Sequence, residues 1–323
     1  MSSSIRIPRS QAVAGWAIFW LVLVVAVTAA GTQWLGADQR QLLAGLRNAP
    51  RFAVIVALWL SINTLLQALF AHVLVVSLGG KIRWRHSIAL VYVATMLNFV
   101  LPMRAGMAFR AVFLKRLYTF PLTLFASSMV AMQFATLMAA AFFGLVGLVW
   151  VSTRSSGVPP QLLWPLVAVI VLCALAFALT RTLRVRLRSR LHLAFEGWQK
   201  ICRDPKTLIA AALSQVGTFV VGTAGLYYSF NALGLGIDLP GSLLLLTSLQ
   251  LGGLASITPG AIGFQEAVGI YVSTALDLSL PECLTALAAM RFVSIAVSVT
   301  TGLPCLEILR RRMAEAGETD DSP

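Results

Sequence analysis

The sequence has few charged residues: they make up 11% of its 323 positions, whereas a soluble domain has about 25%. Acidic residues are the scarcer kind, with 12 Asp and Glu against 25 Lys and Arg. This shortage of charge excludes an ordinary soluble enzyme. The positive excess does not indicate nucleic-acid binding either, because the charges lie between long apolar runs instead of on one soluble face.

Cysteine and histidine are also scarce, with four and three residues in the whole chain. Cys173, Cys202, Cys283 and Cys305 form no Cys-x-x-Cys pair, and their spacing matches no metal-binding motif. The sequence therefore predicts no disulfide framework, no metal site and no cofactor.

Apolar residues are abundant, at 58% of the chain. Several stretches without charge reach the roughly 20 residues that cross a bilayer as a helix. These stretches are residues 10–37, 52–80, 117–153, 155–180, 207–237 and 239–265. Lipid forces backbone amides into helices or closed barrels, and these runs are too long for barrel strands. The predicted fold class is therefore an all-α polytopic membrane protein.

Proline and glycine interrupt two apolar segments, residues 87–117 at Leu-Pro-Met-Arg-Ala-Gly and residues 241–276 at Thr-Pro-Gly-Ala-Ile-Gly. Each segment could be one kinked span or a broken, re-entrant hairpin that returns to its own side. If both segments are hairpins, six full spans remain, and the chain then has eight helices or more. The spans are expected near residues 12–34, 52–78, 120–150, 161–180, 207–233 and 282–309.

The distribution of basic residues favours hairpins over kinked spans. With hairpins, the dense basic segment 181–206 shares one side with most other Lys and Arg, as the positive-inside rule expects of the cytoplasmic face. Both termini are then cytoplasmic. Two short complete crossings in place of each hairpin give the same sidedness, so charge does not separate these two arrangements.

The basic segment 181–206 also has apolar residues at helical spacing, namely Leu187, Leu191, Phe195 and Trp198. This pattern predicts an amphipathic helix lying on anionic lipid of the inner leaflet. A solvated loop is the alternative.

The two broken segments resemble each other in sequence. Proline and glycine have the same spacing in 102–106 and 259–263, and a charged residue followed by Ala-Val comes next in each. Each half has an odd number of crossings, so the sequence predicts an inverted repeat, with halves at about 12–150 and 161–309 in one domain, 1–312. Residues 313–323 are expected to form a disordered acidic tail.

Charged residues and glycines near the two breaks form the candidate binding site. An arginine or an acid at the centre of a membrane helix costs roughly 2.5–3.5 kcal/mol, so such a group needs a partner, water or a ligand. Helix N-termini favour anions, and arginine binds phosphate oxygens through two parallel contacts. The predicted substrate-binding residues are Arg104, Arg110, Glu266, Arg291, Gly106 and Gly263, with Pro102 and Pro259 as structural breaks.

Simpler roles exist for several of these residues. Glu266 and Arg291 could pair only as a packing lock, and Arg110 could extend to the inner surface beside Lys115 and Arg116. Six other polar residues in the spans are expected to form hydrogen bonds between helices rather than contacts with substrate: Asn63, Gln67, Asn98, Gln133, Gln250 and His72. The glycine pairs at 144 and 147 and at 222 and 225 predict close helix packing.

At these residues the sequence resembles the flippase-like membrane domain of lysyl-phosphatidylglycerol synthases, which also occurs as stand-alone bacterial and archaeal proteins. The matching pieces are LNFVLPMRAGMAFR at 97–110, ITPGAIGFQE at 257–266, and Arg291. Met103 and Met107 stand where the family favours glycine and an acidic residue. The resemblance implies a module in a prokaryotic inner membrane that moves a lipid between leaflets. Because the chain ends shortly after Arg312, the synthase domain is not expected here.

The leading functional hypothesis is a lipid translocase, a transporter rather than an enzyme, for a phosphate-bearing phospholipid or polyprenyl-phosphate lipid. Its expected partners are membrane lipids, and a lipid-modifying enzyme is a further candidate partner. Two alternatives remain open: an accessory or regulatory partner of a lipid-synthesising enzyme, and an intramembrane lipid-phosphate transferase. A transferase requires a base and usually a cluster of metal-binding carboxylates, whereas Glu266 is the one acid expected deep in the membrane.

Overall fold

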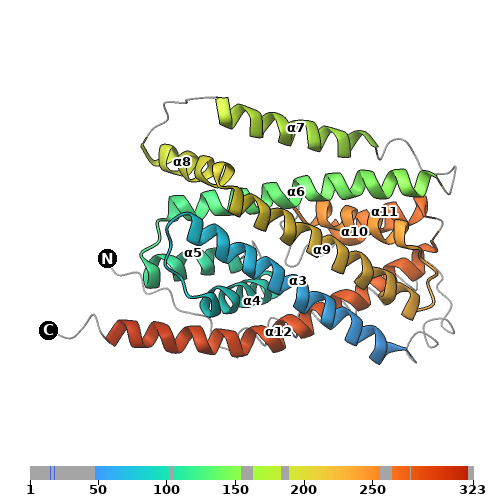
Figure 1. The fold of residues 1–323 in the computed structure, drawn as a ribbon. Helices are drawn as coiled ribbons and strands as arrows, with labels where there is room; N and C mark the ends of the chain where they lie inside the picture. The colour runs from blue at the N-terminus through green and yellow to red at the C-terminus, as the bar shows by residue number, and fades with distance from the viewer. Residues whose placement is uncertain are drawn as a thin grey trace.

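The computed structural model describes residues 48–101, 105–153, 163–182, 189–254, 264–276 and 278–318, together with Gly15 and Ile18. Ten helices account for nearly all of these residues, and no strand occurs among them (Figure 1). The helices are α3 (Ala49–Ser77), α4 (Trp84–Val100), α5 (Ala105–Tyr118), α6 (Leu122–Ser152), α7 (Leu163–Thr182), α8 (Ser189–Arg203), α9 (Pro205–Ala232), α10 (Leu239–Leu254), α11 (Phe264–Ala275) and α12 (Leu280–Glu318).

Four helices are long and apolar enough to cross a membrane: α3, α6, α9 and the Leu280–Met313 part of α12. They coincide with four of the predicted spans. α7 covers the predicted span 161–180, and the predicted span 12–34 lies outside the described residues apart from Gly15 and Ile18. Large apolar side chains cover the outer surface, with Leu213 68% exposed and Leu172 64% exposed. Such a surface suits lipid and not water, which confirms a multi-pass helical membrane protein.

The first broken segment folds back on itself. At one end of the helix pair, His86 of α4 is hydrogen-bonded to the hydroxyl of Tyr118 at the end of α5. At the other end, the backbone N–H of Gly106 donates to Oδ1 of Asn98 across 3.0 Å. α5 therefore returns along α4, and the helices form a hairpin rather than one kinked span.

The second broken segment has the same arrangement. Near the break, the side-chain amide of Gln265 donates to the carbonyl of Leu249 across 3.3 Å. At the far end, Gly241 of α10 lies against Leu276, which follows α11. The described parts of the four hairpin helices have between 12 and 17 residues, or about 18–26 Å.

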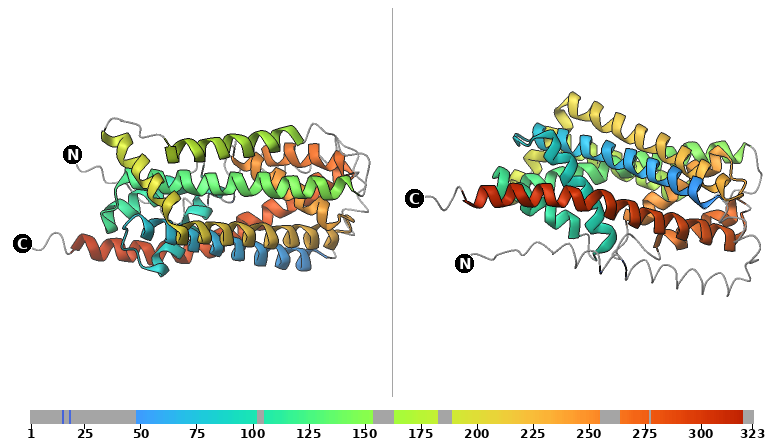
Figure 2. Two further views of the ribbon diagram at one scale, coloured as in Figure 1. Left: turned by 45° about the horizontal axis from the view of Figure 1, so that its top comes forward. Right: turned by 90° about the horizontal axis from the view of Figure 1, so that it is seen from below.

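The two hairpins lie toward opposite ends of the helix bundle, as Figure 1 shows. Each packs against a long helix from the other part of the chain: α4 against α12, and α10 against α6. Between them α3 packs against α9, and Figure 2 shows the two side by side in both of its views. Two large apolar clusters fill the interior of the described part, one around α4 and α5 and the other around α10, and a small third cluster lies between α3 and α4.

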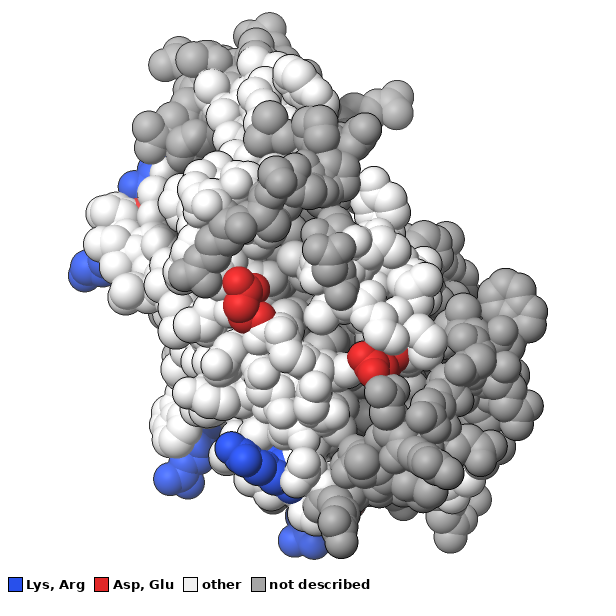
Figure 3. All heavy atoms as spheres, turned by 90° about the vertical axis from the view of Figure 1, so that its right-hand side faces the viewer, with Lys and Arg blue, Asp and Glu red and all other residues white. Residues whose placement is uncertain are grey.

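Basic residues gather at the end of the bundle where α4 begins and α5 ends, which we call the basic end. They are Lys81, Arg83, Arg85, Lys115, Arg116 and, near the end of α12, Arg310, Arg311 and Arg312. Figure 3 views the molecule from the opposite end, where acidic side chains face outward and Lys and Arg appear only at the margin. The described part of the chain thus carries its positive charge mainly at one end.

Helix α8 is amphipathic, as the basic segment 181–206 predicts, but part of its apolar face contacts protein. Trp198 is buried, and its ring lies edge-on to Phe134 of α6 with 5.2 Å between centroids. Gly197 permits this approach, since a Cβ there would lie 2.7 Å from Oγ of Ser127. The prediction that Trp198 faces lipid is therefore wrong. Leu187 and the side chain of Leu191 lie outside the described residues.

Asp204 connects α8 to α9 and caps the N-terminus of α9. Its carboxylate accepts hydrogen bonds from the backbone N–H of Lys206, at 3.2 Å, and from the hydroxyl of Thr207. The Thr207 hydroxyl lowers the pKa of the Asp204 carboxyl below its ordinary value, because these bonds favour the charged form. This cap fixes where the amphipathic helix ends and the membrane helix begins.

The interior polar and glycine positions agree with several sequence predictions. His72 of α3 shares a 3.0 Å hydrogen bond with Ser87 of α4, so it is a satisfied interior residue. Gly225 lies directly under the ring of Trp59, and Gly147 lies against the backbone of Leu244, which confirms close helix packing at these glycines. At the C-terminus, α12 continues to Glu318, into the stretch for which a disordered tail was expected, and residues 319–323 lie outside the described residues. Alanine and glutamate are good helix formers, which accounts for the extension.

Replacing Gly106 with alanine is expected to destabilise the protein by about 1–3 kcal/mol, because overpacking forces the backbone to shift. A Cβ at this position would overlap the backbone of Ala94 and lie 2.7 Å from its carbonyl carbon. Thermal unfolding of the purified protein in detergent measures the effect. Gly236→Ala is the matched control, since Gly236 has no atom within 4 Å of the added Cβ. Equal midpoints for both variants would contradict the tight hairpin.

Candidate functional site

The structure describes half of the residue positions that the sequence analysis proposed for the site. Gly106, Arg110 and Arg291 are described with their side-chain environment, and Glu266 is described only as a position in α11. Pro102, Arg104, Pro259 and Gly263 lie outside the described residues.

Arg110 is the most unusual of these residues. It lies on α5 and is only 4% exposed, whereas Lys115 and Arg116 on the same helix are exposed at the basic end. Its guanidinium carbon lies 5.9 Å from the centroid of the Phe125 ring on α6, a distance typical of a cation–π contact. Its Nε atom is buried and has no hydrogen-bond partner among the described residues. The guanidinium therefore does not extend to the inner surface.

The surroundings of Arg110 make its charge costly. Phe113 and Leu114 on α5 and Phe125 on α6 belong to the buried apolar cluster at this end of the bundle. An unpaired ion in such surroundings costs several kcal/mol relative to water. A charge-assisted contact with an anion would offset much of this cost, because guanidinium groups bind carboxylate or phosphate oxygens through two N–H groups at once.

Gly106 has a packing role that explains its identity. Its N–H is bound to Asn98, so in this structure the amide that the sequence offered to an anion already has a partner. The bond confirms the prediction that Asn98 bridges helices. The lack of a side chain at Gly106 lets the start of α5 touch the backbone of Ala94 on α4.

Arg291 lies on α12 and is 6% exposed. One guanidinium nitrogen, Nη2, donates to Oε1 of Gln265 on α11 across 2.8 Å, and Gln265 in turn donates to the carbonyl of Leu249 on α10. This chain of bonds ties the second hairpin to α12. The bond to Gln265 satisfies one N–H donor of Arg291. Sequence reasoning assigned this contact to the adjacent Glu266, whose side chain lies outside the described residues.

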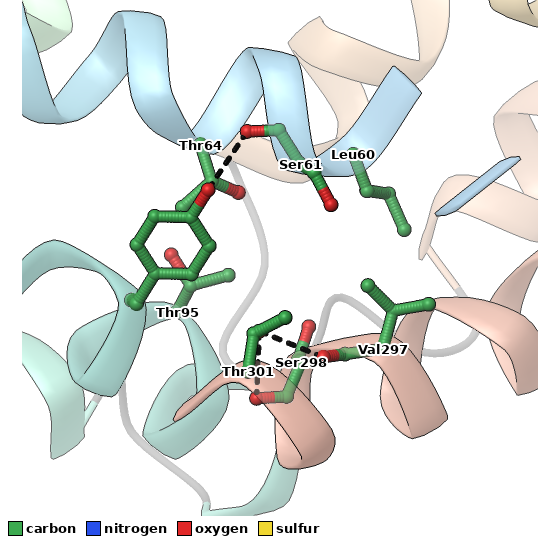
Figure 4. Close-up of a pocket in the computed structure, with 8 residues that line it drawn as sticks. Leu60, Ser61, Thr64, Thr95, Val297, Ser298 and Thr301 are labelled. Atoms are coloured by element: carbon green, nitrogen blue, oxygen red, sulfur yellow. Dashed lines mark hydrogen bonds between the residues drawn. The ribbon is translucent and has the colours of Figure 1, made fainter. Parts of the chain in front are cut away.

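A small cavity lined by several hydroxyl-bearing residues lies between α3, α4 and α12, and we call it the hydroxyl pocket (Figure 4). Its volume is about 10 Å³, close to the smallest that holds one water molecule. It is lined by Leu60, Ser61, Thr64, Tyr92, Thr95, Val297, Ser298 and Thr301. Sequence reasoning missed this pocket, because single Ser and Thr residues on three separate helices form no recognisable motif.

Metal-binding chemistry is not evident in the described part of the chain. No group of three or more His, Cys, Asp or Glu that could hold a metal ion occurs among these residues. The four cysteines, all among the described residues, form no disulfide.

Comparison with known proteins agrees with the helical membrane architecture. Residues 13–302 match the family described as the lysylphosphatidylglycerol synthase TM region. This match covers most of the chain and confirms the resemblance seen at 97–110, at 257–266 and at Arg291. No curated protein matches the sequence. On the extent of this match, the chain belongs to the lysylphosphatidylglycerol synthase TM region family.

Proposed function

We propose that this protein moves an anionic, phosphate-bearing lipid between the two leaflets of a membrane. The observation that carries the proposal is Arg110, a buried arginine whose Nε atom has no hydrogen-bond partner in the described part of the chain. A structural arginine at this depth would be expected to have its N–H groups satisfied. The match to a family of membrane domains supports a role connected with membrane lipids.

The position of Arg110 suits a transient contact with a lipid headgroup. The residue lies on a short hairpin helix instead of on one of the long helices, and its neighbour across the helix interface is an aromatic ring instead of a carboxylate. A headgroup phosphate can therefore bind without displacing an existing ion pair. Because the surroundings are apolar, the attraction to the phosphate is stronger than it would be in water.

The contact pattern supports two inverted halves, with α3 to α6 corresponding to α9 to α12. In this correspondence α4 matches α10, and α6 matches α12. The packing of α4 against α12 should therefore have a counterpart in packing of α10 against α6, and both contacts are present. The contact of α3 with α9 maps onto itself. In transporters built this way, rocking of one half against the other exposes a central site to each side in turn.

The remaining predicted residues belong to the same proposal. Arg104, Glu266 and Gly263 would line the path near the breaks, and Pro102 and Pro259 would produce the breaks themselves. Arg291, held by Gln265, would provide positive charge on the second half. The energy source would be a lipid gradient or the membrane potential, which is worth about 2.3 kcal/mol per charge per 100 mV.

The proposed orientation places the basic end in the cytoplasm of a prokaryote, together with both termini. The positive-inside rule supports this, because the short connections at that end carry the Lys and Arg. The protein would then lie in the inner membrane.

Cysteine labelling in intact cells is expected to confirm this orientation. In a cysteine-free background, a membrane-impermeant maleimide should label Gly236→Cys, in the loop between α9 and α10, because that loop would face outward. Lys200→Cys, on α8 at the other end, should react only after the cells are permeabilised. Both positions are exposed. The reverse pattern would contradict the orientation.

Arg110→Met is expected to slow lipid transfer at least tenfold while stabilising the fold. The methionine keeps the apolar contacts and removes a buried charge whose Nε has no partner among the described residues, so the free energy of unfolding should rise by about 1–3 kcal/mol. Transfer is measured in reconstituted vesicles with fluorescent phosphatidylglycerol and a membrane-impermeant quencher. Stability is measured by thermal unfolding.

Lys115→Met is the control for this experiment, because Lys115 lies on the same helix but is exposed at the basic end. It should transfer lipid at the wild-type rate. An Arg110→Met protein that is folded and transfers lipid at the wild-type rate would refute the proposed function.

A further inference from the structure

Most of the buried polar atoms that lack a hydrogen bond lie on two helices, α3 and α9, which pack side by side (Figure 2). Among the described residues, seven buried side-chain nitrogen or oxygen atoms have no partner. Five of them belong to this helix pair: Nε1 of Trp59 and Oδ1 of Asn63 on α3, and the hydroxyls of Thr218, Thr223 and Ser229 on α9. The unsatisfied groups are thus concentrated at one helix pair.

Water does not satisfy these groups in the structure. Each of the five atoms has almost no surface accessible to water, so the packed helices leave no space for a water molecule beside it. A buried polar group without a partner pays the full cost of its desolvation, and the surrounding bilayer offers no partner either. The α3–α9 contact is therefore less stable than it would be with its hydrogen bonds formed.

Two contacts fix the register of α3 on α9. The hydroxyl of Ser214 on α9 donates to the carbonyl of Leu66 on α3 across 3.2 Å. Further along the interface, a Cβ added at Gly222 of α9 would lie 3.5 Å from Nε1 of Trp59 on α3. The helices are therefore antiparallel, because residue numbers rise along α3 from 59 to 66 while they fall along α9 from 222 to 214.

Asn63 and Thr218 lie midway between these two contacts. On α3, Asn63 follows Trp59 by four residues and precedes Leu66 by three, and on α9, Thr218 lies four residues from each of the two contacting residues. Residues three or four apart share one face of a helix, so Asn63 and Thr218 lie at the same level on facing surfaces. Asn63 is 8% exposed and Thr218 is 4% exposed.

The unsatisfied atoms of Asn63 and Thr218 are complementary. The amide oxygen of Asn63 is an acceptor without a donor, and a threonine hydroxyl is able to donate to it. Glycines surround Thr218 on this face, since Gly217 lies against Leu66 and Gly225 lies under the ring of Trp59. Glycine presents no side chain to the facing helix, so α3 can turn slightly on α9 without releasing interlocked side chains.

The contact of α3 with α9 is also the one that maps onto itself when the two halves are exchanged. Rocking of the halves, which this inference takes from the proposed function, would turn one of these helices on the other. We propose that α3 and α9 form a two-state interface. In the structure Asn63 and Thr218 are unsatisfied, and in the second state the Thr218 hydroxyl donates to the Asn63 amide oxygen. Close packing of Trp59 on Gly225 favours the first state, and the added hydrogen bond favours the second.

Pulsed electron spin resonance between two nitroxide labels tests the proposal. In a cysteine-free background, Lys81→Cys before α4 and Lys206→Cys on α9 place one label on each half, and both positions are exposed. Wild-type protein in lipid nanodiscs should show two distance populations. Asn63→Leu and Thr218→Val should each reduce the population of the second state about tenfold, because each removes a hydrogen bond present only there. Both should also raise the thermal midpoint by a few degrees, because each removes a buried atom that has no partner in the structure.

Two further variants serve as controls. Thr218→Ser keeps the hydroxyl and should retain both distance populations. Thr300→Val removes an exposed hydroxyl of α12 that is bonded within its own helix, and it should leave both populations and the thermal midpoint unchanged. Each variant is first checked for a monodisperse gel-filtration profile, so that a misfolded protein is not scored.

A single distance population in folded wild-type protein would overturn the proposal. Populations that Asn63→Leu and Thr218→Val leave unchanged would overturn it as well, and so would a lowered thermal midpoint in both variants, since that is expected of groups already bonded. Neither measurement needs lipid transfer. Two populations that respond to the substitutions in a protein that transfers no lipid would support the two-state interface and refute the proposed function.

Discussion

The bilayer offers no hydrogen-bond partners to the groups inside it, and most of this structure follows from that constraint. Long uninterrupted helices satisfy their own backbones, as α3, α6, α9 and α12 do. Where proline and glycine break two segments, the chain folds back so that helix ends are covered by neighbouring helices. Asn98 binds the N–H of Gly106 at the first break, and Gln265 binds the carbonyl of Leu249 at the second. In both hairpins a side-chain amide beside the break therefore forms a hydrogen bond with a backbone group of the other hairpin helix.

The same constraint distinguishes the two buried arginines by their hydrogen bonds. Arg291 and Arg110 are about equally buried, yet Arg291 is bonded to Gln265 while the Nε of Arg110 has no partner. The exposed fractions of the two side chains are similar, so only their hydrogen bonds distinguish them. A buried arginine N–H that the described part of the protein leaves without a partner is expected where a ligand of opposite charge binds and leaves.

Sequence reasoning predicted those features that depend on composition and local chain chemistry. The long spans, the two hairpins, the satisfied His72 and the close packing at Gly225 all follow from hydropathy, from breaks and from small residues. It missed contacts between helices that are distant in sequence. The bond of Arg291 to Gln265 is one of these contacts, and the predicted pairing of Arg291 with Glu266 stays a prediction, because the Glu266 side chain lies outside the described residues. The burial of Trp198 and the hydroxyl pocket depend on how separate helices meet, and no local pattern specifies this.

The α4–α5 hairpin contributes both to the hydroxyl pocket and to the proposed lipid site. α4 contributes Tyr92 and Thr95 to the hydroxyl pocket, and α5 carries Arg110 against α6. Because the contact of Gly106 with Ala94 leaves no space between α4 and α5, the two helices are expected to move together. A shift of this hairpin away from α12 would open the hydroxyl pocket, and a shift away from α6 would uncover Arg110.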